Sequence, residues 1–343
     1  MDETPNDRTG TTSGTTSGTT SGTTSGTTSG TTSGTPPGTA SAARPGLDPG
    51  YGVAPPGFRL PDATRLGAVR LQVSDLDRAL AFYTSVIGFR VLGREGDTAA
   101  LAPLDDDRVL VELSARAGTR AAGRHGLLGI YHFAILLPDR AALGRFVRHL
   151  ADMRVPAGAG DHLVSEAFYL SDPDGIGIEV YADRPRDSWR RNGHELRLAT
   201  DPVDVDGLLL AAGDERWRGI PAGTVIGHVH LHVGDLTIAR AFYSDALGFD
   251  VMAWSYPGAL FLGAGGYHHH LGTNTWAGAG ARAPADDDAQ LLHWTIELPT
   301  AADVAAAQAS LVRGGVTAID VAPGVVQLRD PWGTALRLRA AAR

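Results

Sequence analysis

The chain contains no cysteine. Disulfides, zinc–thiolate centres and thiol nucleophiles are therefore excluded, because each needs a cysteine sulfur. Any bound metal has to be held by histidine and carboxylate side chains. The sequence also lacks an apolar run near the ~18 residues of a membrane helix, and its N-terminus has no apolar segment typical of a secretory signal. We therefore expect a cytoplasmic protein without a membrane partner.

Basic side chains are in the minority and form no run. The chain has 30 Lys and Arg residues against 38 Asp and Glu residues, for a formal charge of -8. Such a chain is a poor candidate for binding nucleic acid. Its 343 residues, of which 43% are hydrophobic, predict two domains at roughly 100–200 residues per domain.

The first 61 residues consist largely of small and polar side chains. A Gly-Thr-Thr-Ser repeat starts at Gly10, and proline pairs follow at 36–37 and 55–56. Because such a segment has almost nothing to bury, we predict a disordered tail over residues 1–61.

The remaining sequence repeats internally. Residues 66–76 have the pattern of residues 226–236, and the turn-like segment 172–175 recurs at 330–333. Equivalent residues lie about 160 positions apart, which indicates a duplicated half. Further strand patterns at 130–136 and 292–296 divide each half again, so that four modules begin near residues 66, 129, 226 and 291.

Each module has the pattern of one strand, one helix and three strands. Val229, Leu231 and Val233 alternate as in a strand with one buried face. Asp75 and Asp235 stand where a helix N-cap belongs, ahead of an apolar stripe.

Four such βαβββ modules predict an α+β fold of two curved eight-stranded sheets. We expect one domain over 62–186 and a second over 222–343, each of two modules. Residues 187–221 form the predicted linker, with a short helix starting near Val205.

Four motifs resemble the glyoxalase and extradiol dioxygenase superfamily, also called vicinal oxygen chelate proteins. The motifs are Gly227–Val233, Gly266–Gly272, Tyr131–Leu136 and Phe168–Tyr181. In this order they are most similar to two-domain bacterial catechol 2,3-dioxygenases. The resemblance covers about residues 62–341.

The resemblance implies that metal ligands come from the first and last strands of a module. Ala68 and Arg337 occupy two of these positions and cannot ligate. His132, Glu179 and His228 supply the two histidines and one carboxylate typical of non-haem Fe(II) oxygenases, and Mn(II) accepts the same set. The other candidate positions carry Glu112, His293 and His270 or a neighbouring histidine.

The same resemblance implies a catechol-type aromatic substrate and O2, and it assigns further site residues. A histidine 40 to 42 residues after His228 would move protons, and we favour His270 or His268, which share a strand face by alternation. Tyr169 would hydrogen-bond the bound catecholate, and His162 is the candidate for a further family histidine.

In larger family members both metal modules belong to the second half. Here the fourth module has Arg337 where the carboxylate belongs. We therefore predict that module two pairs with module three across the halves, and that module one pairs with module four or with another subunit. The oligomeric state stays open, and a homo-oligomer is one possibility.

Two alternative functions also stay open. One is a glyoxalase-type metal-dependent isomerase or transferase, and the other is a metal-free small-molecule binding or resistance protein.

Overall fold

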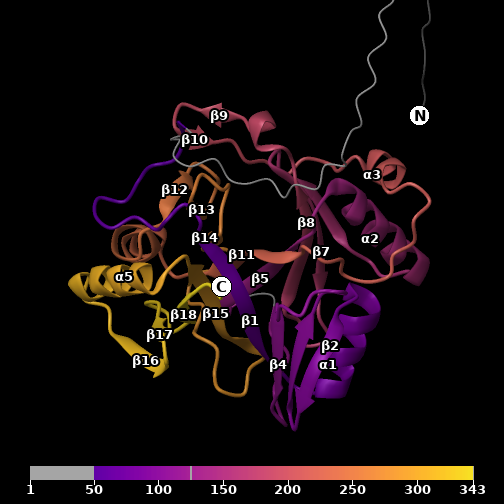
Figure 1. The fold of residues 1–343 in the computed structure, drawn as a ribbon, viewed down its shortest axis with the longest axis horizontal. Helices are drawn as coiled ribbons and strands as arrows, with labels where there is room; N and C mark the ends of the chain where they lie inside the picture. The colour runs from indigo at the N-terminus through magenta and orange to yellow at the C-terminus, as the bar shows by residue number, and fades with distance from the viewer. Residues whose placement is uncertain (1–49, 124–125, 343) are drawn as a thin grey trace, which may run out of the picture. The chain divides into compact units, whose positions relative to one another are not determined.

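The computed structural model describes residues 50–123 and 126–342. The tail predicted for residues 1–61 lies, up to residue 49, outside the described residues. Its last part is corrected: Val53 pairs with Val251, and Leu60 is buried in the core, so residues 50–61 are packed against the rest of the chain. The described chain forms two eight-stranded mixed sheets with helices packed against them (Figure 1), which confirms the predicted α+β fold.

The first sheet carries strands of modules two and three. In spatial order it contains β12 (Asp250–Ala253), β13 (Ala259–Gly263), β14 (Leu271–Asn274), β11 (Val225–His232), β5 (Gly129–Leu136), β8 (Gly177–Asp183), β7 (Ser165–Ser171) and β6 (Gly158–Asp161).

The second sheet carries strands of modules four and one. In spatial order it contains β16 (Ala318–Ala322), β17 (Val325–Arg329), β18 (Ala335–Ala340), β15 (Gln290–Leu298), β1 (Arg65–Val73), β4 (Val111–Ala115), β3 (Thr98–Ala102) and β2 (Arg90–Glu95).

In the described chain, each module contains one helical segment, and a 3₁₀ turn and an α-helix lie between the two halves. They are α1 (Leu76–Phe82) continued by the π-helix η1 (Tyr83–Ile87), α2 (Arg140–Met153), the 3₁₀ turn η2 (Arg186–Ser188), α3 (Val205–Ala211), α4 (Leu236–Arg240) continued by the π-helix η3 (Ala241–Ala246), and α5 (Ala301–Arg313).

The modules pair across the two halves of the chain. β5 pairs with β11, and β1 pairs with β15, in both cases antiparallel. The predicted pairing of module two with three, and of module one with four within one chain, is confirmed. The domain boundaries at 62–186 and 222–343 stay a prediction.

Local sequence explains where the helices begin. The Asp75 side chain accepts a hydrogen bond from the Arg78 backbone N–H, and Asp235 does the same for Ile238. Each cap satisfies one of the N–H groups that a helix start leaves without a partner. The short helix expected near Val205 is α3.

One hydrophobic core lies on the helix side of both sheets. Val69 and Leu71 of β1, together with Val229 and Leu231 of β11, are fully buried in it. Burying each such side chain contributes about 1.5–3 kcal/mol. Because strand neighbours face opposite ways, the residues between them, including His230, point to the opposite sheet face.

A short linker segment is tied to module three. It contains β9 (Arg191–Asn192) and β10 (Glu195–Leu196). The buried Glu195 carboxylate accepts hydrogen bonds from the backbone N–H groups of Trp254 and Ser255. This contact holds the residues that follow β10 against the first sheet.

The Asp172-Pro-Asp-Gly turn feeds β8 through a buried carboxylate. Asp172 Oδ1 accepts hydrogen bonds from the backbone N–H groups of Asp174 and Ile176, and Oδ2 accepts one from the Tyr83 hydroxyl. Burial raises the pKa of Asp172 to about 6, against the hydrogen bond from Ile176, which lowers it. The carboxyl therefore keeps its proton to a higher pH in the folded protein than it does in the unfolded chain.

We expect Asp172→Asn to flatten the pH dependence of stability. The folded pKa of about 6 exceeds the unfolded value of 3.8, so this group's contribution is full below about pH 4 and is lost as the pH rises to about 6. The loss amounts to about 3 kcal/mol at most. The amide keeps the hydrogen-bond geometry but does not titrate. Urea unfolding at pH 4, 5, 6 and 7 measures the difference, and Asp187→Asn, at an exposed position, should leave the profile unchanged. Parallel profiles for Asp172→Asn and the wild type would contradict this expectation.

Candidate metal centre

Three strands of the first sheet bring the predicted ligands together. β5 lies between β11 and β8, and its Ala134 stands opposite His228 on one side and Glu179 on the other. His132 precedes Ala134 by two residues and so shares its sheet face. The small Ala134 side chain leaves room above it, where the three longer side chains meet.

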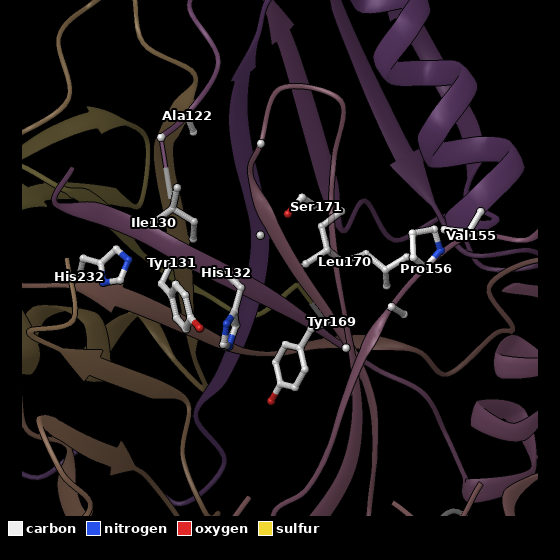
Figure 2. A pocket seen from close by; sticks show the side chains of 16 residues that line it. Ala122, Ile130, Tyr131, His132, Val155, Pro156, Tyr169, Leu170, Ser171 and His232 are labelled. Atoms are coloured by element: carbon white, nitrogen blue, oxygen red, sulfur yellow. The ribbon is translucent and has the colours of Figure 1, made fainter. Parts of the chain in front are cut away.

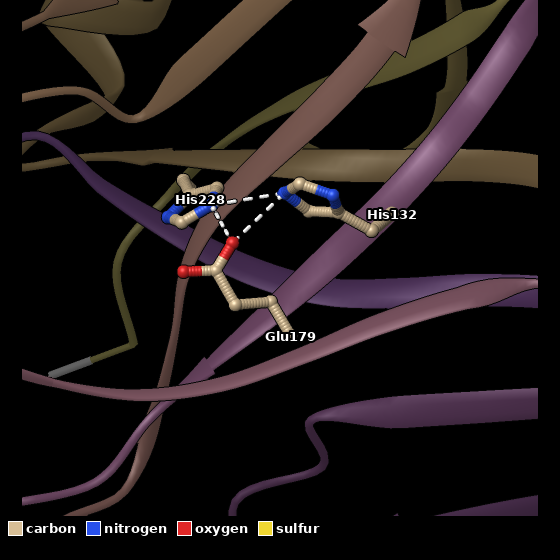
Figure 3. Close-up of side chains that lie close together, drawn as sticks. All are labelled: His132, Glu179 and His228. Atoms are coloured by element: carbon tan, nitrogen blue, oxygen red, sulfur yellow. Dashed lines mark hydrogen bonds and ion pairs between the residues drawn. The ribbon is translucent and has the colours of Figure 1, made fainter. Parts of the chain in front are cut away.

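The three side chains converge on one point, as Figure 3 shows. His132 Nε2 lies 3.0 Å from Glu179 Oε2 and 3.2 Å from His228 Nε2. His228 Nε2 lies 3.1 Å from the same Glu179 oxygen. All three side chains are buried. Each of the three residues offers one possible ligand atom, and these atoms all lie within 4.8 Å of one another.

The spacing of these atoms fits a metal ion. Ligands about 2.1 Å from a metal are roughly 3.0 Å apart on one face of an octahedron and roughly 3.4 Å apart in a tetrahedron. The observed 3.0–3.2 Å lies closer to the octahedral face. Two imidazoles and a carboxylate on one face are the ligand set of non-haem Fe(II) oxygenases, in which the opposite positions are open to reactants.

The electrostatics of the three residues suit this role. Burial by itself raises the pKa of Glu179, but the His228 charge and the hydrogen bonds from His132 and His228 outweigh it and hold that pKa well below its usual value. Burial lowers the pKa of His132, although Glu179 opposes the shift. An ionised carboxylate beside a neutral imidazole is the protonation state that metal binding requires.

Tyr169 and His162 lie beside this centre. Tyr169 on β7 stands opposite Glu179 in the sheet, and its hydroxyl lies 2.5 Å from His162 Nε2. His162 Nδ1 lies 2.7 Å from the Ala199 carbonyl oxygen. Because a carbonyl only accepts, Nδ1 carries the proton, and Nε2 accepts the hydrogen bond from Tyr169. Burial and the Glu179 charge raise the pKa of Tyr169 well above its usual value, so the phenol keeps its proton.

The three consecutive histidines differ from the expectation. His269 lines the cavity, and its ring centre lies 4.2 Å from that of His228. His268 instead lies 2.8 Å from the Asp183 carboxylate through Nε2, and 2.7 Å from His269 Nδ1 through its own Nδ1. His270 Nδ1 accepts a hydrogen bond from the Ala264 N–H.

The placement of His268 and His270 in the cavity is therefore corrected. The strand alternation used to orient them does not apply, because β14 begins only at Leu271 and the preceding residues form a turn. The turn directs His269 toward the metal ligands and its two neighbours into the protein.

The cavity over the centre has a volume of about 240 Å³ and largely aromatic walls. Trp276 and Tyr256 both line it. Sequence reasoning missed the linker residues 198–200, because no pattern marks them. The remaining walls come from Tyr131, His230 and Phe261.

A second hollow adjoins the cavity along the ends of β5, β7 and β8. It measures about 720 Å³ and shares Tyr131, His132 and Tyr169 with the inner cavity. Figure 2 shows the Tyr169 and His132 side chains extending in the same direction in this view. Of the three predicted ligands, His132 lines both spaces.

Comparison with known proteins gives a family match over most of the chain. The model of the Glyoxalase/Bleomycin resistance protein/Dioxygenase superfamily matches residues 65–180 and 225–338. In the described ranges no helix is long and apolar enough to cross a membrane.

Two curated proteins are similar in sequence. A catechol-2,3-dioxygenase from Bacillus subtilis (strain 168) is 48% identical over 239 residues, which cover 69% of this chain and 83% of the relative. A biphenyl-2,3-diol 1,2-dioxygenase from Pseudomonas sp. (strain KKS102) is 28% identical over 222 residues, which cover 60% of this chain and 66% of the relative.

Two solved structures share the fold. One, from Bacillus subtilis subsp. subtilis str. 168, is provisionally described as a dioxygenase. It has a TM-score of 0.58 at 11% identity, and the match covers 84% of this chain and 87% of the Bacillus chain. A glyoxalase I variant from Zea mays has a TM-score of 0.50 at 19% identity. The match covers 81% of this chain and 94% of the Zea mays chain.

Proposed function

Because the chain belongs to the Glyoxalase/Bleomycin resistance protein/Dioxygenase superfamily, we propose that it is an extradiol dioxygenase that opens a catechol ring with O2. The observation that carries the proposal is the buried group of His132, Glu179 and His228 at the base of an aromatic cavity. The 48% identity to a catechol-2,3-dioxygenase over most of the chain supports it. A cytoplasmic location remains part of the proposal.

His132, Glu179 and His228 would hold Fe(II) or Mn(II). The bound metal would supply Lewis acidity that favours the ionised catechol, and a place where catechol and O2 meet. With one carboxylate and two neutral imidazoles, the site keeps one positive charge, which suits a catecholate monoanion. The aromatic side chains of Tyr131, Tyr256 and Trp276 would enclose the substrate ring.

Tyr169, His162 and His269 would act on the substrate directly. Tyr169 keeps its hydroxyl proton and donates it to His162, so its oxygen would accept a hydrogen bond from the hydroxyl that the catecholate monoanion keeps. His269 has its Nδ1 toward His268, which leaves Nε2 as the atom that would give or take a proton during ring opening.

A direct assay tests the proposed function. The protein is purified anaerobically, loaded with Fe(II) and supplied with catechol, 3-methylcatechol or 2,3-dihydroxybiphenyl while O2 uptake and absorbance are recorded. A yellow hydroxymuconic semialdehyde, formed with one O2 per ring, is the expected result. Protein that contains iron but neither consumes O2 nor forms a coloured product with any of these catechols would overturn the proposal.

We expect Tyr169→Phe to lower kcat/KM for catechol by roughly 10- to 100-fold, the effect of losing one hydrogen bond to a charged group. The ring and its packing remain, so the metal content should not change. Steady-state kinetics with parallel elemental analysis measure both. Tyr51→Phe is the matched control, because the Tyr51 hydroxyl bonds the Gly266 carbonyl outside the cavity. Equal kcat/KM values for Tyr169→Phe and wild type would remove Tyr169 from the site.

A further inference from the structure

The second sheet repeats the geometry of the metal-bearing sheet with different side chains. Arg70 stands opposite His293 in the second sheet, as His230 stands opposite His132 in the first. Arg337 stands opposite Thr295, as Glu179 stands opposite Ala134. His293 thus takes the place of His132, and Arg337 takes the place of Glu179.

These replacements reverse the charge at the equivalent position. The sequence repeat places Ala68 where His228 lies in the first sheet, so a single imidazole remains of the three metal ligands. A guanidinium, Arg337, replaces the carboxylate, and a second one, Arg70, replaces His230. The position cannot hold a metal cation, but it gathers two cationic side chains around one imidazole.

All three side chains share the sheet face that points away from the core. Their strand neighbours Val69, Trp294 and Leu336 are fully buried in the core, so the residues beside them face the other way. The two guanidinium groups lie close enough to act on the imidazole. The pKa of His293 is lowered to about 4, mainly by burial and further by the positive charges of Arg337 and Arg70.

The hydrogen-bond donors of these three side chains are only partly paired within the described chain. Both ring nitrogens of His293 are buried without a hydrogen-bond partner in the described chain, although the residue is only 6% exposed. Arg337 donates through Nε to Gln327 Oε1, which leaves its two Nη groups. Arg70 approaches Glu112 only to 3.8 Å, beyond hydrogen-bond distance.

Neighbouring carboxylates do not satisfy these donors. Glu112 is 38% exposed on its side chain and offsets one of the two positive charges. Glu297, on the same face, is engaged by Arg339 at 2.6 Å. Among the described residues, Arg337 has no carboxylate within ion-pair distance. A buried donor without a partner costs free energy, and an oxyanion between Arg337 and His293 would relieve that cost.

We propose that Arg70, His293 and Arg337 form a binding site for a small oxyanion, either a carboxylate or a phosphate. A planar guanidinium binds both through paired N–H groups, and the His293 N–H supplies a further donor. The site is separate from the metal ligands and does not depend on the proposed dioxygenase activity.

Calorimetric titration of the full-length, metal-loaded protein with sodium phosphate and with sodium acetate tests this site. We expect saturable binding of at least one anion by wild type, weakened about tenfold or more in Arg337→Gln. Tighter binding of phosphate would indicate a phosphate-bearing ligand, and tighter binding of acetate a carboxylate ligand. Arg339→Gln is the matched control, because Arg339 lies on the same face of β18 but is paired with Glu297.

A second readout separates binding from loss of fold. Addition of the anion should shift the ¹H–¹⁵N signals of the His293 ring, assigned through their absence in His293→Ala. Arg70→Gln should weaken binding as Arg337→Gln does, with an unchanged circular dichroism spectrum. No saturable binding by wild type, or equal affinities for wild type, Arg337→Gln and Arg70→Gln, would overturn the proposal.

Discussion

Glu179→Ala is expected to abolish metal retention and to lower ring-opening activity by about a thousandfold or more. Glu179 supplies the one negative charge among the three ligands, and its Oε2 lies within 3.1 Å of both imidazole nitrogens. Without it, two buried imidazoles remain to hold a dication. Metal catalysis supplies several kcal/mol of transition-state stabilisation, and each 1.36 kcal/mol is tenfold in rate. Elemental analysis and O2 uptake measure the two losses.

The control for this variant is Glu297→Ala in the other sheet. Glu297 is also a strand carboxylate with a largely buried side chain, and its partner is Arg339. Its removal should leave metal content and activity unchanged. If Glu179→Ala kept a full equivalent of metal after dialysis, the assignment of the centre to His132, Glu179 and His228 would be wrong.

His269→Gln is expected to lower kcat by roughly 100- to 1000-fold while the metal stays bound. A positioned acid–base group contributes about 10²–10⁴ in rate, and glutamine keeps polarity but cannot carry a proton between substrate and protein. His269 lines the cavity beside His228 but is not one of the three converging ligands. The measurement is single-turnover ring opening under saturating O2, with metal content determined on the same sample.

The neighbouring histidines give this prediction its contrast. His270→Gln should change kcat by less than about threefold, because His270 bonds the Ala264 N–H and does not line the cavity. His268→Gln should have an intermediate effect, since His268 contacts His269 directly. A larger loss in His270→Gln than in His269→Gln would return the role to His270, as the strand alternation had first suggested.

The periodic part of the sequence carried enough information to predict the fold and the metal centre. Alternation around Val229 and the N-cap aspartates fix strand and helix locally, and duplication repeats them. The partner of each module followed from chemistry. Arg337 stands where a ligand belongs, so the three residues able to ligate had to come from modules two and three, which the sheet order confirms.

The non-periodic part could not be predicted in the same way. Gly265 and Gly266 both adopt positive φ, at 58° and 66°, and the turn they form decides which of three histidines faces the cavity. A pattern of alternating residues has no meaning where the backbone is not extended. The linker residues that close the cavity are held there by distant contacts such as Glu195 with Trp254, and sequence separation hides such contacts.

The interleaving of the two halves sets an order for assembly during synthesis. When a ribosome has made the first half, β5 has β8 as its partner but still awaits β11, which begins at Val225. β1 likewise awaits β15. In the nascent chain, β5 and β1 therefore each have one edge without a hydrogen-bonded neighbour. Unpaired strand edges of this kind promote aggregation and are bound by chaperones. A metal bound by the proposed ligands His132, Glu179 and His228 could be taken up only after His228 has been translated, when the second half of the chain is partly made.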